Sequence, residues 1–85
     1  MVTFEYTVRD EAGIHARPAG MLVNKVKSLG VTVTIEKDGK TASASKLFAV
    51  MGLGVKCGET VMISVEGENE LAASDELLEF FKSNL

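Results

Sequence analysis

Three stretches of the chain alternate apolar and polar residues, and each alternation predicts a β-strand. Apolar side chains occupy every second position from Val2 to Val8, and the same period of two recurs from Val31 to Glu36 and from Val61 to Val65. Successive side chains of a strand point to opposite faces, so this pattern is typical of strands with one buried and one solvated face. We therefore expect a sheet that is covered on one side only.

Two further stretches repeat apolar residues at helical spacing. The first runs from about Ala16 to Leu29, with Pro18 in the first turn, where a missing N–H removes no helical hydrogen bond, and Gly30 at the expected C-cap. The second follows Asn69 as N-cap and continues through Lys82. Its inner stripe is expected to consist of Leu71, Leu78 and Phe81.

The middle of the chain predicts a hairpin followed by a short helix. Asp38-Gly39 supplies the positive backbone angles of a tight turn, so the second strand is expected to turn directly into a third strand over Lys40 to Ala44. Ser45 is the expected N-cap of a short helix from Lys46 to Met51. The predicted element order is β-α-β-β-α-β-α.

This order favours the α+β class. The economical packing is an open-faced sandwich, in which three helices cover one face of a four-stranded antiparallel sheet. A length of 85 residues suits one compact core, so we expect residues 1–85 to form a single domain. The hydrophobic share of 46% and the charged share of 25% are those of an ordinary globular protein and argue against disorder.

Charge and cysteine content exclude several classes of function. The net charge of -3 offers no overall basic field for nucleic acid. Cys57 is the only cysteine, which excludes an internal disulfide and a Cys-x-x-Cys metal or redox pair, and we expect it to be a small, buried apolar side chain. No apolar run approaches membrane-spanning length, and Met1 to Arg9 lacks the pattern of a signal peptide. The expected location is the cytoplasm, and no metal or cofactor is expected.

The candidate chemistry lies at the start of the first predicted helix. His15, the only histidine, stands there with Arg17 two residues later. Free N–H groups and the positive end of the helix dipole favour a neutral imidazole and an incoming anion, and a guanidinium can bind phosphoryl oxygens with a planar fork. Helix starts of this kind are also common without covalent chemistry, so spacing alone leaves both a reactive histidine and a surface or capping histidine open.

The segment Gly13-Ile14-His15-Ala16-Arg17-Pro18-Ala19 resembles the active-site signature of the HPr family, the histidine phosphocarriers of the bacterial sugar phosphotransferase system. The resemblance covers essentially the whole chain, and further matching segments are Gly39 to Ala44, Leu47-Phe48, Leu53-Gly54, Gly58 and Glu66-Gly67-Glu68. It implies that His15 is phosphorylated on Nδ1 by phosphorylated enzyme I, charged from phosphoenolpyruvate, and passes the group to enzyme IIA components of sugar permeases. Arg17 would stabilise the phosphoryl oxygens. Such a protein is a carrier and not an enzyme with turnover.

The resemblance also implies that the short second helix is part of a docking face beside His15. Among its apolar side chains, Phe48 and Met51 are expected to bind partners, whereas Leu47 and Val50 fit a docking and a core position equally well. Other residues expected at the partner surface are Ala16, Gly20 and Lys27. Gly20 departs from the family, which usually has Ala near the first turn of this helix. A carrier that presents one face to successive partners is expected to be monomeric.

A second departure concerns regulation. Many relatives carry a kinase-targeted serine where this chain has Lys46, and Ser45 lies one position earlier. Regulatory phosphorylation is therefore not carried over. A related regulatory branch keeps that serine but lacks the histidine, which is the reverse of this sequence.

Two other classes of function compete with the carrier. A ferredoxin-like binding or interaction module would share the element order, but a single cysteine and a single histidine make a poor metal site. A hydrolase would need His15 to fold against one of three serines, Ser43, Ser45 or Ser64. Which sugar or permease is served lies in the partners and not in this sequence.

Overall fold

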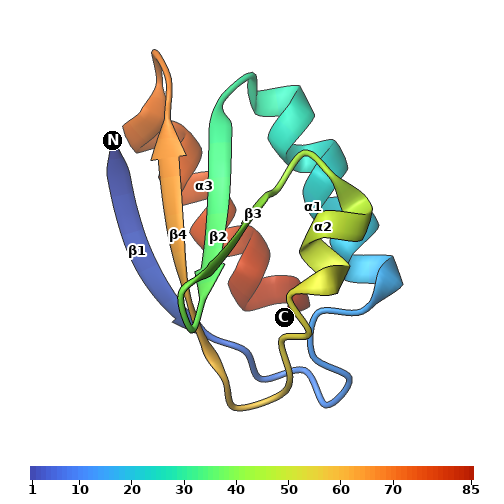
Figure 1. Cartoon of the computed structure of the whole chain (residues 1–85). Coiled ribbons are helices and arrows are strands. Elements are labelled where there is room, and N and C mark those ends of the chain that lie inside the picture. Colours follow the sequence, from blue (N-terminus) through green and yellow to red (C-terminus); the bar gives the residue numbers. More distant parts are fainter.

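The computed structural model describes all 85 residues and confirms the predicted order of elements (Figure 1). The elements are β1 (Val2–Thr7), α1 (Ala16–Leu29), β2 (Thr32–Lys37), β3 (Lys40–Ser43), α2 (Leu47–Gly52), β4 (Thr60–Glu66) and α3 (Glu70–Asn84). None of the three helices is both long and apolar enough to cross a membrane.

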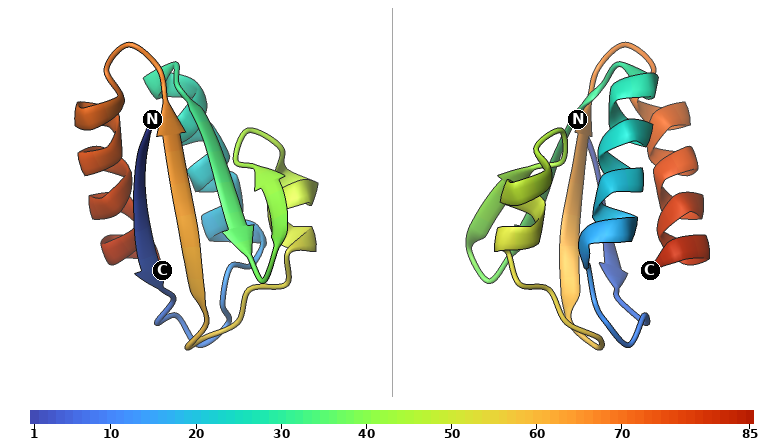
Figure 2. Two further views of the ribbon diagram at one scale, coloured as in Figure 1. Left: turned by 60° about the vertical axis from the view of Figure 1, so that its left-hand side comes forward. Right: turned by 90° about the vertical axis from the view of Figure 1, so that its right-hand side faces the viewer.

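The four strands form one antiparallel sheet in the order β1-β4-β2-β3. β4 is the central strand of the three longer ones, and Ile63 on it is paired with Phe4 of β1 on one side and Ile35 of β2 on the other. The hairpin between β2 and β3 turns at Asp38 and Gly39, whose φ angles of 50° and 82° confirm the predicted turn. Figure 2 shows β3 at the edge of the sheet beside α2.

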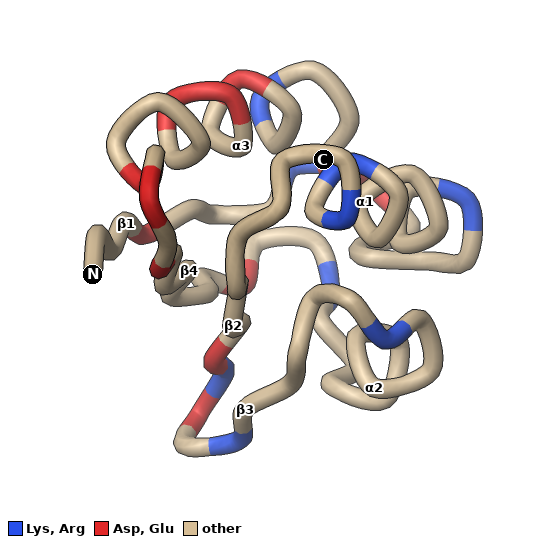
Figure 3. The backbone as a smooth tube through the Cα atoms, turned by 90° about the horizontal axis from the view of Figure 1, so that it is seen from above, with Lys and Arg blue, Asp and Glu red and all other residues tan.

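The helices cover a single face of this sheet, as the sequence predicts. Seen from above, α1, α2 and α3 all lie on the same side of the strands (Figure 3). Between the two layers is one apolar core, and its largest fully buried side chains include Leu22 of α1, Ile35 and Ile63 of the sheet, and Leu77 and Phe81 of α3. The opposite face of the sheet carries the polar residues of the alternating strands and is open to solvent.

The inner stripe predicted for α3 is only partly correct. Leu71 is 72% exposed, and the buried positions are Ala73, Ser74, Leu77 and Phe81, with Leu78 half-buried. Residues two apart on a helix are separated by about 200°, so once Ala73 faces the sheet, Leu71 turns away from it. The helix also extends past Lys82 to Asn84.

Two local expectations are wrong. Ser45 is not the N-cap of α2, because its hydroxyl is hydrogen-bonded to the Ser43 hydroxyl at 2.8 Å and Lys46 takes the N-cap position without a side-chain cap. Cys57 is exposed, since it lies in the turn before β4, and its thiol is directed at the carbonyl of Arg9 at 3.6 Å. Asn69 does occupy the N-cap of α3, although its side chain makes no capping hydrogen bond.

A polar clamp joins the end of β2 to the segment that leads into β4. The ammonium of Lys37 lies 2.9 Å from a carboxylate oxygen of Glu59 and donates to the carbonyl of Gly54 at 3.1 Å. The same carboxylate oxygen accepts the backbone N–H of Lys56 at 2.7 Å. These contacts lower the pKa of Glu59, chiefly through the Lys37 hydrogen bond and then through the Lys56 N–H.

This clamp predicts a pH-dependent loss of stability in Glu59→Gln. A carboxylate with a lowered pKa in the folded state stabilises the protein above its unfolded pKa, and the contribution disappears as the pH falls through the folded pKa. We expect the variant to unfold at a lower urea concentration than the parent at neutral pH, and the two midpoints to converge in acid. Glu68→Gln, which removes an exposed carboxylate, is the control. A gap between parent and Glu59→Gln that persists unchanged in acid would contradict the assignment.

Candidate functional site

A tight turn before α1 positions His15 at the start of this helix. The backbone N–H of Gly13 donates to the carbonyl of Asp10 at 2.9 Å, and the N–H of Ala12 donates to the Asp10 carboxylate at 2.9 Å. The N–H of Ile14 then donates to the carbonyl of Val55 at 3.1 Å, which attaches the turn to the segment before β4. The buried Ile14 side chain anchors the same point in the core.

His15 itself is the N-cap of α1. Its backbone is extended, with φ -100° and ψ -177°, and its carbonyl accepts the N–H of Ala19 at 3.0 Å. The imidazole makes no capping hydrogen bond, and 42% of the side chain is exposed. No acidic residue stands in the first turn of α1. The positive end of the helix therefore meets a free and accessible imidazole.

The imidazole lies in a cavity of about 250 Å³ between the start of α1 and the end of α3. The lining residues are Asp10, His15, Arg17, Pro18, Met21, Ser83 and Asn84. The Nε2 atom of His15 is 3.8 Å from a carboxylate oxygen of Asp10. Arg17 is exposed and lines the same cavity, so a guanidinium is available to an anion bound there.

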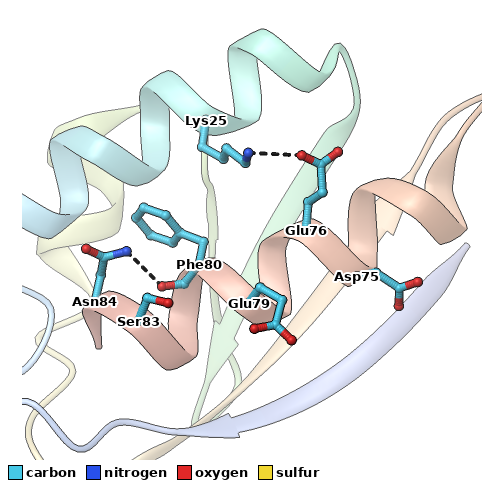
Figure 4. A pocket seen from close by; sticks show the side chains of 7 residues that line it. All are labelled: Lys25, Asp75, Glu76, Glu79, Phe80, Ser83 and Asn84. Carbon is cyan, nitrogen blue, oxygen red and sulfur yellow. Dashed lines mark hydrogen bonds and ion pairs between the residues drawn. The ribbon is translucent and has the colours of Figure 1, made fainter.

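A second cavity, of about 420 Å³, lies farther along the same two helices (Figure 4). Three carboxylates line it, and one of them, on Glu76, is paired with Lys25 at 3.1 Å. Its other lining residues are Phe80, Ser83 and Asn84, and it contains neither histidine nor arginine. The structure contains no group of three or more His, Cys, Asp or Glu side chains able to hold a metal ion. The His15 cavity is therefore the candidate site.

The short helix α2 presents its side chains in two directions. Phe48 is 83% exposed, whereas Val50 is fully buried in the core. Leu47 and Met51 are half-buried and pack against the core from its margin. The question left open by the sequence is thus answered for Val50, which is a core residue.

Comparison with known proteins identifies the family. The protein-family model described as "PTS HPr component phosphorylation site" matches residues 2–83. The chain belongs to the HPr family. The phosphocarrier protein HPr of Borreliella burgdorferi is 39% identical to it over 83 residues, which is 98% of this chain and 96% of that protein. The crystal structure of HPr-C-His from Thermoanaerobacter tengcongensis matches with a TM-score of 0.91 and 31% identity, covering 98% of this chain and 93% of that one.

Membership of the HPr family confirms the function implied by the sequence resemblance. The protein is a phosphocarrier in the phosphotransferase system for sugar transport and not an enzyme with turnover. HPr is a cytoplasmic protein family, in agreement with the expected location. The hydrolase and the ferredoxin-like module are therefore set aside.

Of the three α1 residues predicted for the partner surface, two lie near His15 and the third lies far from it. Ala16 is exposed beside His15, and Gly20 is half-buried one turn farther on. Lys27 is exposed in the last turn of α1, about 17 Å along the helix axis from Ala16, so it does not border the His15 cavity.

Four residues that line the cavity were not predicted from the sequence. Met21 is 42% exposed and lies four residues after Arg17, so helical spacing could have revealed it. Ser83 and Asn84 carry no comparable signal, because the end of α3 reaches the first loop only through the tertiary fold. Asp10 is close to His15 in sequence, but only the turn between them brings its side chain to the cavity.

The approach of Gly13 to Val55 predicts a specific defect in Gly13→Ala. A Cβ at Gly13 would lie 2.2 Å from the Val55 carbonyl oxygen, and its φ of +67° also disfavours alanine. Gly30 has a φ of +68° with no atom within 4 Å, so Gly30→Ala isolates the backbone cost of about 1–2 kcal/mol. We expect Gly13→Ala to lose more stability in urea denaturation and also to shift the NMR signals of His15. Equal losses in the two variants would show that the close approach is not maintained.

Proposed function

We propose that His15 is the residue that carries the phosphoryl group, on its Nδ1 atom. The observation that carries this assignment is that the only histidine of an HPr-family chain occupies the N-cap of α1 with an exposed imidazole that the helix does not use. Its Nε2 atom is on the Asp10 side, which leaves Nδ1 for the incoming phosphorus. Phosphorylated enzyme I is the proposed donor, and enzyme IIA components are the proposed acceptors.

Transfer requires little covalent work from this chain. The lone pair of Nδ1 forms the bond to phosphorus while the bond to the donor breaks and its electron pair stays on the donor. Charge is spread over three phosphoryl oxygens, and N–H groups at the start of α1 together with Arg17 offer it fixed positive partners. Exposure of both His15 and Arg17 suits a group that is exchanged between proteins.

The docking surface is proposed to surround His15 on α1 and α2. Phe48 is its most exposed apolar side chain, and Met51 and Leu47 flank it at the margin of the core. Ala16 and Gly20 extend this surface along α1, and Lys27 adds a basic edge. α2 packs beside α1, so the two helices offer one continuous face to a partner.

We propose that the working carrier is a monomer. Proteins of the HPr family interact with enzyme I and enzyme IIA, and dimeric structures of similar proteins also exist. The HPr dimer of Thermoanaerobacter tengcongensis matches this chain with a TM-score of 0.75 and 32% identity, covering 92% of this chain and 90% of that one. A monomer leaves the His15 face open to successive partners, which is the reason for the proposal.

We propose no serine-kinase control at the start of α2. Lys46 stands where many relatives carry the modified serine, and it cannot accept phosphate. Ser45 is half-buried and its hydroxyl is hydrogen-bonded to Ser43. This engagement disfavours Ser45 as a substitute target.

The role of His15 is tested by phosphorylation. With enzyme I and phosphoenolpyruvate, the parent protein should gain one acid-labile, base-stable phosphate, and His15→Ala should gain none. Intact-protein mass spectrometry counts the phosphate, and Arg17→Ala should still become labelled, but more slowly, because the acceptor nitrogen is kept. Labelling of His15→Ala would exclude His15 as the acceptor.

The docking role of α2 is tested with a pair of neighbouring variants. Phe48→Ala removes an exposed ring, so we expect slower transfer from enzyme I and a change in unfolding free energy within about 0.5 kcal/mol. Val50→Ala removes a fully buried side chain and should cost about 2 kcal/mol, with normal transfer by the folded fraction. Urea denaturation and rapid-quench transfer kinetics separate the two effects. If Phe48→Ala lost stability and its folded fraction transferred normally, Phe48 would not belong to the docking surface.

A further inference from the structure

Asp10 is the only acidic residue in the His15 cavity, and the fold holds it firmly. Its backbone N–H donates to the backbone oxygen of Leu85, the last residue of the chain, at 2.9 Å, and its carbonyl accepts the N–H of Gly13 at 2.9 Å. The carboxylate oxygen that faces His15 also accepts the N–H of Ala12 at 2.9 Å. Three hydrogen bonds therefore fix the residue, and the side chain cannot swing away without breaking one of them.

The imidazole of His15 presents Nε2 to this carboxylate. A neutral imidazole carries one proton, on either nitrogen, and the group that faces each nitrogen decides which form is favoured. An ionised carboxylate only accepts hydrogen bonds, so it favours the proton on Nε2 and leaves the lone pair on Nδ1. The separation of 3.8 Å is about 0.8 Å longer than a usual N–H···O hydrogen bond. Contacts of this kind often tighten only when the reacting partner is bound.

We propose that Asp10 is a positioning residue for phosphoryl transfer, which holds His15 in the form with the proton on Nε2. The inference rests on the proposed role of His15. When Nδ1 bonds to phosphorus, its lone pair is used and the ring gains positive charge while the proton stays on Nε2. The Asp10 carboxylate stabilises that charge, and when the phosphoryl group leaves, the electron pair of the N–P bond returns to Nδ1 and the charge disappears.

Asp10 and Arg17, which carry opposite charges, then interact with different parts of the phosphorylated histidine. Asp10 faces Nε2, whereas Arg17 is available to the phosphoryl oxygens that arrive at Nδ1. These two are the only charged side chains that line the cavity with His15. Asp10 also repels the phosphoryl oxygens, but it faces the nitrogen remote from them, so its attraction for the ring is the larger effect.

The test compares two neighbouring carboxylates. Asp10→Asn keeps an oxygen that can accept the Ala12 N–H but removes the negative charge, and Glu11→Gln makes the same charge change at an exposed residue outside the cavity. Exposed ion pairs contribute up to about 1 kcal/mol, so transfer from enzyme I and to enzyme IIA should slow up to about fivefold in Asp10→Asn, with unchanged partner affinity. Glu11→Gln should transfer normally.

A second readout needs no partner protein. Nitrogen-15 chemical shifts of the neutral imidazole report which nitrogen carries the proton, and we expect the Nε2–H form to predominate in the parent and to decrease in Asp10→Asn. Asp10→Ser, whose hydroxyl can still accept the Ala12 N–H, should behave in the same way and serves if the amide variant does not fold.

The outcomes separate this inference from the proposed function. An unlabelled parent protein would overturn the role of His15, whatever the tautomer. A labelled parent whose neutral His15 carries its proton on Nδ1, or variants of Asp10 that transfer as fast as Glu11→Gln, would overturn the role of Asp10 alone.

Discussion

The placement of the site depends on one close approach between two backbone segments. The N–H of Ile14 donates to the carbonyl of Val55, and the lack of a side chain at Gly13 allows the chains to come this near. The contact fixes where the first loop ends, so it also fixes which residue becomes the N-cap of α1. Val55 belongs to the segment that the Lys37–Glu59 clamp ties to β2. The position of His15 is therefore set by the sheet and not by its own helix alone.

Much of the fold could be predicted because the spacing of apolar residues along the chain reveals most of its strands and helices. Alternation located β1 and β4 to within about a residue or two, and Asp38-Gly39 identified the hairpin even though β3 is weakly apolar. The same reasoning gave a wrong prediction where an apolar side chain points away from the core. Leu71 is apolar but lies outside the stripe that Leu77 and Phe81 direct into the core, and only the packed structure reveals which side of α3 faces the sheet.

The site was predictable in part for the same reason. His15 and Arg17 are neighbours in the chain, so a short motif brings them together. Asn84 reaches the cavity from the far end of the sequence, and Asp10 reaches it through the fold of the turn before His15, so the local composition of neither residue indicates that it lines the cavity. Likewise, Phe48 and Val50 are both apolar residues of one short helix, and only its packing shows that one is a surface residue and the other a core residue.

The charges of the helices are segregated in a way that the net charge conceals. α1 has Arg17, Lys25 and Lys27 and no acidic residue, whereas α3 has four acidic residues and Lys82 as its only basic one. Figure 3 shows acidic positions along α3 and basic positions along α1, and the two sets meet at the Lys25–Glu76 pair. A negatively charged surface would therefore be attracted to the α1 side and repelled by the α3 side once it comes within about 8 Å, since charges farther apart are screened at physiological salt. Salt should then act mainly on how often encounters are correctly oriented, and much less on how long a formed complex lasts.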